Sequence, residues 1–125
     1  MSTGIVVFAH GSSIHSANEA VRAVTRAVAR AGRPECAEAA FLEPHHPTLD
    51  ETVSRMAAAG VTRVVIVPYF LTLGLHLQRD LPEIVRHLQH VHKDMDICVT
   101  PPLDGHPGLA GIVVDRAREA LAKWR

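Results

Sequence analysis

The sequence predicts a parallel, doubly wound α/β domain in which helices flank a four-stranded sheet. Four short apolar runs are β-branched and nearly continuous instead of alternating, which is typical of parallel strands covered on both faces. Segments with helical spacing separate these runs, so strand and helix alternate four times along the chain. The four expected strands are residues 5–9, 37–42, 64–67 and 97–99.

The first expected strand leads into a helix over residues 16–31. Ser16 and Glu19 have the Ser-x-x-Glu spacing of a capping box, which satisfies two backbone amides at a helix start. Apolar residues then recur at helical intervals: Ala17, Ala20, Val21, Val24, Ala27 and Val28.

The second expected helix has clear signals at both ends. Thr48 and Glu51 form another capping box after the second strand. Gly60 ends the helix, because glycine readily takes the left-handed conformation that follows many helices.

The last two helices begin at prolines. Pro82, flanked by Asp80 and Glu83, predicts the start of the third helix, and Pro107 predicts the start of the fourth. The apolar stripes are Leu81, Ile84, Val85 and Leu88 in the third helix, and Leu109, Ile112, Val113, Ala117 and Leu121 in the fourth. With no linker or repeat, residues 1–125 are expected to form a single domain.

Composition narrows the class of protein. Thirteen basic residues balance thirteen acidic ones, so the chain lacks the basic surface of a non-specific nucleic-acid binder. No apolar stretch approaches the roughly 20 residues of a membrane span, and residues 1–4 resemble no signal peptide. Cys36 and Cys98 match no CxxC or zinc-finger spacing, and free thiols are favoured over a disulfide because nothing suggests export. We therefore expect a cytoplasmic protein without membrane or nucleic-acid partners.

The nine histidines fall into two groups. His87, His90 and His92 lie late in a helical segment and are interpreted as solvated helix surface. The other six lie at or just after expected strand ends, where ligands bind in doubly wound sheets: His10, His15, His45, His46, His76 and His106. All four strands are thus followed by a segment that contains a histidine.

Histidines that meet at an open edge suit a weakly held divalent ion such as cobalt, nickel, iron or zinc. No HExxH motif supports a zinc hydrolase. A serine hydrolase or phosphatase is disfavoured, because Ser12 and Ser13 lie in no G-x-S-x-G motif and no arginine precedes His10. Gly11, Ser12 and Ser13 form either a simple turn or a set of amides that binds carboxylates or phosphates.

The chain resembles the small class II chelatases, in the short CbiX-type form of the sirohydrochlorin cobaltochelatases. The third matching segment is the most specific, since Gly74, His76, Asp80 and Pro82 keep their spacing together. The matching segments occur in family order: Ala9-His10-Gly11-Ser12 with Asn18, Ala40-Phe41-Leu42-Glu43 with Pro47 and Leu49, Val67-Pro68 through Pro82, and Pro101-Pro102-Leu103 with His106-Pro107.

The resemblance implies a chelatase-like, flavodoxin-like fold and a lyase that inserts a divalent metal into sirohydrochlorin without ATP or redox change. It implies that His10 and His76 bind the metal and take pyrrole protons, and that Glu43 assists. The metal, Co²⁺ first and then Fe²⁺ or Ni²⁺, is a substrate, and no organic cofactor is expected. The expected substrate contacts are Gly11, Ser12, Ser13, Phe70, Leu71, Thr72, Leu73, Gly74 and Leu75.

The sequence also departs from the family pattern. Ser13 stands where many members have an arginine, so the resemblance does not say how the substrate carboxylates are held. His45 and His46 are either additional metal contacts or solvated loop residues, and the second reading is favoured. For His106 a structural role at a helix start is favoured over metal binding.

A flat, polycarboxylated tetrapyrrole is large for one 125-residue unit, which offers half of a deep cleft. We therefore expect a homodimer whose two carboxyl-end faces form one cavity. Two other functions remain open: a non-catalytic metal carrier or tetrapyrrole holder on the same fold, and a flavodoxin-like regulatory domain in which the histidines are incidental.

Overall fold

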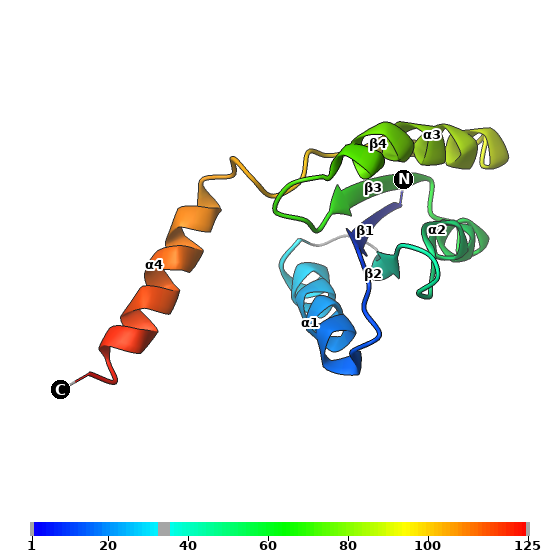
Figure 1. The fold of residues 1–125 in the computed structure, drawn as a ribbon. Coiled ribbons are helices and arrows are strands. Elements are labelled where there is room, and N and C mark those ends of the chain that lie inside the picture. Colours follow the sequence, from blue (N-terminus) through cyan, green and yellow to red (C-terminus); the bar gives the residue numbers. More distant parts are fainter. Residues whose placement is uncertain (1, 33–35, 125) are drawn as a thin grey trace.

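The computed structural model describes residues 2–32 and 36–124, so Met1 and Arg125 at the ends of the expected domain lie outside it. Strands and helices alternate as expected (Figure 1). Their order is β1 (Thr3–Ala9), α1 (His15–Ala31), β2 (Cys36–Phe41), α2 (Leu49–Ala58), β3 (Arg63–Pro68), α3 (Leu75–Val91), β4 (Asp96–Val99) and α4 (Gly108–Leu121).

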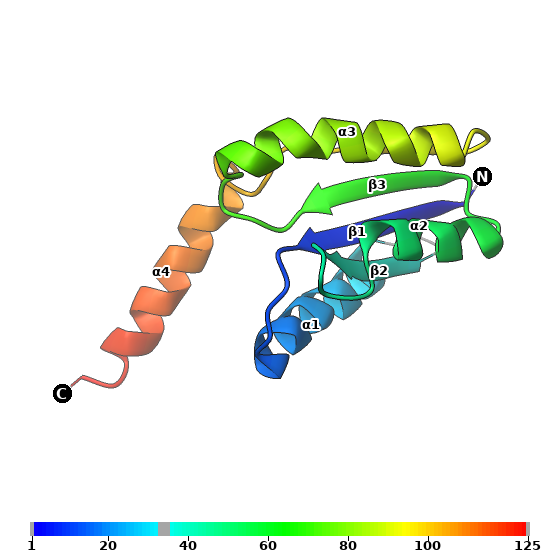
Figure 2. The same ribbon diagram turned by 45° about the vertical axis from the view of Figure 1, so that its right-hand side comes forward.

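The four strands form one parallel sheet in the order β2-β1-β3-β4, which confirms the predicted fold class. Because the strands are parallel, their carboxyl ends all lie at the same edge of the sheet (Figure 2). We call this edge the carboxyl edge. The order of the strands reverses next to β1, and such a reversal is where doubly wound sheets bind their ligands.

Alternate side chains of β1 build the two sides of the core. Val6 and Phe8 face the side covered by α2 and α3, while Val7 and Ala9 face the side covered by α1. All four are buried, as expected for a strand in the middle of a sheet.

Two helix starts differ from the sequence prediction. The first helix begins at His15 with Ile14 as its N-cap, and no side chain caps it, so Ser16 and Glu19 form no capping box. The third helix begins at Leu75 with Gly74 as its N-cap, so Pro82 lies inside it instead of at its start. The second helix has the predicted capping box.

Helix α4 stands apart from the sheet. It begins at the carboxyl edge and projects away from the other elements (Figures 1 and 2). None of its side chains is buried, although its pattern predicts an apolar face.

The cysteines lie at opposite edges of the sheet, Cys36 on β2 and Cys98 on β4. Three strand spacings of about 4.8 Å separate these edges, too far for a disulfide within one chain. Among the described residues, no helix is both long and apolar enough to cross a membrane.

Candidate functional site

The residues predicted to act in the site lie along the carboxyl edge. His10 directly follows β1, Glu43 lies two residues after β2, and His76 is the second residue of α3. All three side chains are exposed. They come from three different segments, and the parallel sheet brings those segments to one edge.

His10 sits at the end of β1 against an aromatic pair. The His10 and Phe70 ring centroids are 6.5 Å apart in an edge-to-face arrangement, and Phe70 contacts Phe8 in the same way at 6.1 Å. The Nδ1 atom of His10 lies 3.2 Å from the carbonyl oxygen of Gly11. Phe70 therefore joins the segment after β1 to the segment after β3.

The turn after His10 is held by Asn18. The Asn18 side chain accepts a hydrogen bond from the amide of Ser12 at 2.9 Å and donates one to its carbonyl at 2.8 Å. The Oγ atom of Ser12 accepts from the amide of Ile14 at 3.0 Å. One amide of the expected anion-binding turn, that of Ser12, is thus used within the protein, as is the amide of Ile14 just after the turn. The side chain of Ser13 is exposed.

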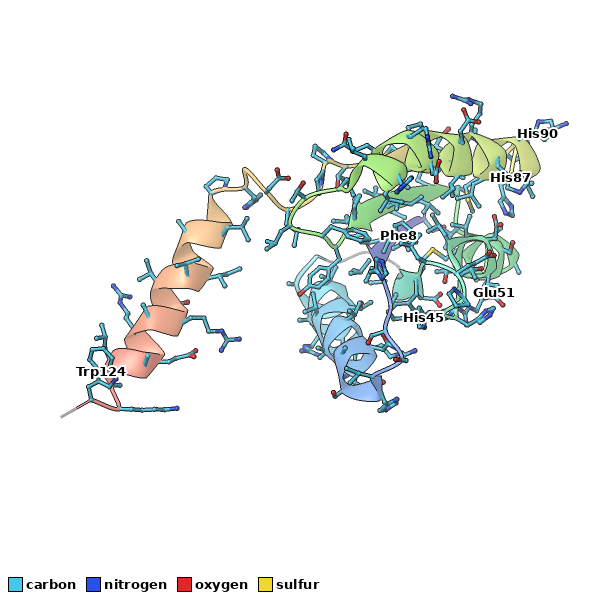
Figure 3. All side chains as sticks on the ribbon, in the orientation of Figure 1. Phe8, His45, Glu51, His87, His90 and Trp124 are labelled. Atoms are coloured by element: carbon cyan, nitrogen blue, oxygen red, sulfur yellow. The ribbon has the colours of Figure 1, made fainter. Side chains whose placement is uncertain are left out.

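Gly11 meets two constraints in this turn. Its φ of +83° lies in the left-handed region, and an added Cβ would stand 2.8 Å from the ring of His45. His45 is therefore packed against the segment that carries His10, instead of being a solvated loop residue as favoured from the sequence. Figure 3 shows His45 next to the end of β1 near Phe8.

His46 is exposed, as expected, but it has a partner. Its Nδ1 atom lies 2.6 Å from a carboxylate oxygen of Glu51, which also accepts a hydrogen bond from the backbone amide of Thr48. The Thr48 amide, followed by His46, lowers the pKa of Glu51 from 4.5 to about 2. The Nδ1 atom of His46 therefore serves the start of α2, which leaves Nε2 as the ring nitrogen that can bind a metal.

The low pKa of Glu51 predicts a stability change in acid. A carboxylate with a lowered folded-state pKa stabilises the fold above its unfolded pKa, and this stabilisation is lost as the pH falls from 4.5 through about 2. Replacing Glu51 by Gln should therefore flatten the pH dependence of the thermal midpoint in this window. Thermal melts from pH 5 to pH 2 test this, and parallel curves for the two proteins would contradict it.

Glu43 lines a cavity of about 290 Å³ at the carboxyl edge. A second carboxylate, Asp50, lines the same cavity from the first turn of α2, and the remaining walls are mostly apolar. Neither His10 nor His76 lines it. Glu43 is thus a carboxylate on a hollowed surface beside the histidines, and the three groups form no closed cluster.

His76 occupies the first turn of α3. Its Nδ1 atom lies 3.3 Å from a guanidinium nitrogen of Arg79, one helical turn later. Arginine can only donate, so Nδ1 accepts, and a metal ion at Nδ1 requires Arg79 to move away. The Arg79 side chain is 73% exposed, and its Nε atom also lies 3.4 Å from a carboxylate oxygen of the exposed Asp80.

The segment before His76 presents apolar side chains in two directions. Phe70 and Leu73 pack against the core below the edge. Leu71 and Leu75 point outward and are 64% and 83% exposed. Two exposed leucines thus lie in the segment that leads into His76, and Thr72 and Gly74 are also exposed between them.

Within residues 2–32 and 36–124, no three His, Cys, Asp or Glu side chains lie close enough together to hold a metal ion. The sheet brings His10, Glu43 and His76 to one edge but does not make them a ligand set. A metal ion at this edge needs further ligands, which water or a substrate can supply.

His106 takes the structural role at a helix start that the sequence favours, while His87 and His90 are exposed as expected and His92 is half-buried. His106 Nδ1 accepts the amide of Gly108 at 2.9 Å, at the start of α4. His87 and His90 lie near the end of α3 that is remote from the carboxyl edge (Figure 3). His92 also lies at that end, where its Nε2 atom is 3.4 Å from the hydroxyl of Ser54.

Two features of the site were missed from the sequence. Arg79 lies beside His76, and its only signal was the three-residue spacing that puts both side chains on one face of a helix. The contact of His45 with Gly11 joins residues 34 positions apart in the sequence, so no local sequence pattern predicts it.

A profile of the CbiX family matches residues 4–120. The sirohydrochlorin cobaltochelatase of Methanopyrus kandleri is 32% identical, and the match covers 95% of this chain and 97% of that protein. The sirohydrochlorin cobaltochelatase of Methanosarcina acetivorans is also 32% identical, over 94% of this chain and 96% of that protein.

Solved structures agree with this fold. A cobalamin (vitamin B12) biosynthesis CbiX protein from Marinobacter aquaeolei matches with a TM-score of 0.86 at 30% identity, over 98% of this chain and 99% of that one. The sirohydrochlorin chelatase SirB from Bacillus subtilis, solved in complex with cobalt, matches with a TM-score of 0.85 at 22% identity. That match covers 95% of this chain but 51% of SirB, and it supports the fold alone.

Proposed function

We propose, from the premise that this chain belongs to the CbiX family, that it is a sirohydrochlorin metal chelatase, a lyase of the cobaltochelatase type. The observation that carries the proposal is the position of His10, Glu43 and His76 at one exposed edge of the sheet. The relatives of this chain, matched over nearly their whole length, are named sirohydrochlorin cobaltochelatases.

The reaction exchanges two protons for one ion. A divalent metal enters the macrocycle, two pyrrole N–H bonds break, and the two protons leave without any change in oxidation state. Neutral imidazole near pH 7 can bind the incoming ion and accept a proton in turn. We assign these roles to His10 and His76, and we assign to Glu43 the transfer of protons from the edge to solvent.

The incomplete ligand set suits this reaction. An ion held by many protein ligands would not be released, whereas one or two imidazoles hold it weakly until the four macrocycle nitrogens replace them. Imidazole binds Co²⁺, Ni²⁺ and Fe²⁺ alike, so the donors do not select among them. We propose Co²⁺ first, because the relatives are named cobaltochelatases, with Fe²⁺ and Ni²⁺ as the other candidates.

The macrocycle is proposed to lie on the segment before His76. The outward side chains of Leu71 and Leu75 form an apolar surface of the kind that covers a flat ring. Arg79, with its exposed guanidinium beside His76, and Ser13 are the groups we propose for the substrate carboxylates in place of the arginine that the family pattern has at position 13. No organic cofactor is needed for this reaction.

We also propose that the enzyme acts as a homodimer in the cytoplasm, without nucleic-acid or membrane partners. The exposed leucines and the open arrangement of the three polar side chains leave one side of the substrate uncovered in a single chain. A second copy facing the carboxyl edge covers it.

The decisive assay follows the absorption spectrum of sirohydrochlorin while Co²⁺, Fe²⁺ and Ni²⁺ are supplied separately to the pure protein. We expect at least one metal to be inserted faster than in the protein-free mixture. If the protein binds metal or pigment but accelerates no insertion, it is a carrier and the enzyme proposal is wrong. If it binds neither, the histidines are incidental to function.

Gly74 provides a test of where the macrocycle lies. Its φ of −67° is ordinary, and no atom lies within 4 Å of an added Cβ, so the Gly74→Ala variant meets no steric clash. Gly74 is the N-cap of α3, where alanine is less favourable than glycine, so we expect a loss of about 0.5–1 kcal/mol in the free energy of unfolding. The added methyl enters the space assigned to the substrate, so KM for sirohydrochlorin should rise. Thermal melts and KM measurements check both expectations.

The contrasting variant is Gly11→Ala. Its positive φ and the nearby ring of His45 predict a loss of about 1–2 kcal/mol in the free energy of unfolding. An unchanged KM in a folded Gly74→Ala protein would mean that the macrocycle does not approach this part of the edge.

A further inference from the structure

His46 and Glu51 form a pair at the start of α2. The Nδ1 atom of His46 lies 2.6 Å from a carboxylate oxygen of Glu51, and the backbone amide of Thr48 donates to the same oxygen at 2.8 Å. The Thr48 hydroxyl accepts the amide of Glu51 at 3.2 Å in return, so the backbone of the helix start fixes the carboxylate. Because an ionised carboxylate can only accept, the proton of the His46 ring lies on Nδ1.

The other ring nitrogen of His46 therefore carries a lone pair. The side chain is 68% exposed, and among the described residues no group forms a hydrogen bond with Nε2. Histidines that bind metals commonly donate their second ring N–H to a carboxylate or a backbone carbonyl, which orients the ring and raises its basicity. His46 has this arrangement.

His10 shares the arrangement, and two other histidines show the reverse. The Nδ1 atom of His10 lies 3.2 Å from the carbonyl oxygen of Gly11, which can only accept, so Nε2 of His10 also carries the lone pair. In His76 and His106, Nδ1 accepts instead, from a guanidinium at 3.3 Å and from a backbone amide at 2.9 Å, so the neutral ring holds its proton on Nε2. Of these four histidines, His10 and His46 can bind an ion at Nε2 without any rearrangement.

The segments that carry His10 and His46 are in contact at the carboxyl edge. The first residue after β2 donates its amide to the last carbonyl of β1 at 3.1 Å. His45, next to His46 in the chain, packs so closely on Gly11, next to His10, that a Cβ added to the glycine would stand 2.8 Å from the His45 ring. An ion held by His46 is thus held beside the segment of His10.

We propose that His46 is a metal-binding residue, which takes a hydrated divalent ion at Nε2 and passes it to Nε2 of His10. The imidazole replaces one water of the ion, and the other positions keep their water. Nothing is oxidised, and no proton is released, because Nε2 carries none. A single imidazole holds the ion weakly enough for it to move on. The transfer to His10 rests on the proposed function, whereas binding at His46 does not.

The alternative is that the pair of His46 and Glu51 only stabilises the start of α2. The two roles use different atoms of the ring. Stabilisation of the helix start uses Nδ1 alone, whereas an ion occupies Nε2. A measurement that reports on Nε2 therefore decides between them.

Long-range proton–nitrogen NMR spectra of the histidine side chains, recorded without pigment during a Zn²⁺ titration, provide this measurement. Zn²⁺ is diamagnetic and takes the same imidazole donors as Co²⁺. Before metal is added, His46 should show its proton on Nδ1. The control is His15, an exposed histidine at the start of α1 for which the described residues supply no carboxylate partner. Nε2 of His46 should respond at a Zn²⁺ concentration at least about 10-fold lower than the ring of His15.

Glu51→Gln tests the role of the carboxylate in the same titration. The variant should lose the advantage of about 10-fold that His46 has over His15, because the ring is no longer oriented by a charge. Far-UV circular dichroism checks that the variant is folded. If His46 responds no earlier than His15 in the wild-type protein, or responds equally well in Glu51→Gln, the proposal is wrong.

The transfer to His10 is tested in the insertion assay. His46→Ala should raise KM for Co²⁺ by about 10-fold and change kcat less, because at high concentration the ion reaches His10 directly. His15→Ala should leave both constants at the wild-type values. An unchanged KM for Co²⁺ in His46→Ala would overturn the transfer.

The NMR titration does not depend on metal insertion. Zn²⁺ bound at His46 in a protein that inserts no metal would overturn the proposed function and leave the His46 site standing. Metal insertion by a protein whose His46 binds no ion would do the reverse.

Discussion

Replacing His76 or His10 by Ala is expected to reduce metal insertion by at least about 100-fold, the lower end of what a positioned proton acceptor contributes. Each substitution removes an imidazole that we assign to both the incoming ion and a pyrrole proton. The measurement is the rate of pigment conversion at saturating sirohydrochlorin and metal, after subtraction of the protein-free rate.

The fold should survive these substitutions. His10 and His76 are exposed, and their polar contacts, to the Gly11 carbonyl at 3.2 Å and to Arg79 at 3.3 Å, join near neighbours in the chain and are long. The thermal midpoint should therefore stay close to that of the wild-type protein, so that lost activity cannot be attributed to unfolding.

His87→Ala is the matched control for His76→Ala. Both residues are exposed histidines of α3, but His87 lies near the end remote from the carboxyl edge (Figure 3). We expect it to insert metal at the wild-type rate. If His76→Ala behaves like His87→Ala, the role assigned to His76 is wrong, and any loss in both variants points to general metal scavenging by surface histidines.

The strands were predictable because their chemistry is local. Each is a run of β-branched or small apolar residues, and burial on both faces of a parallel sheet demands little else. Their parallel order then places whatever follows each strand at one edge. That rule alone predicts that His10 and Glu43 lie at the carboxyl edge, which is where the structure places them.

The start of α3 was mispredicted because packing outweighs a local signal. Proline commonly marks the first turn of a helix, and the sequence offered Pro82 between two acidic residues. In the structure, Leu81 is buried, and Leu77 packs against the same core one turn earlier. Burying Leu77 extends the helix back to Leu75, which moves His76 from a loop onto a helix and brings Arg79 beside it.

The position of α4 could not be predicted from local sequence patterns, and the reason differs from that for α3. Its sequence pattern predicts that one face of the helix is apolar, but the pattern does not indicate which surface covers that face. Before α4, the amides of Leu103 and Asp104 donate to the carbonyls of Phe70 and Leu71, each 33 positions earlier in the chain. The contact between His45 and Gly11 likewise joins residues 34 positions apart. Long-range contacts of this kind determine how the segments around the site are held together. The sequence pattern determines which residues lie at the carboxyl edge.

Glu43→Gln is expected to slow insertion by about 100-fold or more while metal binding to the protein is retained. Glutamine keeps the size of the side chain and removes the charge that can take up a proton. Because Glu43 belongs to no cluster of possible metal ligands among the described residues, cobalt titration of the free protein should give the wild-type affinity.

Asp50→Asn is the control for this prediction, since Asp50 is the other carboxylate of the same cavity. It lies in the first turn of α2, where its charge complements the helix dipole, so its loss should cost about 0.3–1 kcal/mol of stability with little effect on turnover. If both variants lose activity equally, the charge of the cavity as a whole matters and Glu43 has no specific role. If Glu43→Gln also loses cobalt affinity, the carboxylate binds the metal instead of moving the proton, and the two histidines must then account for both protons that leave the macrocycle.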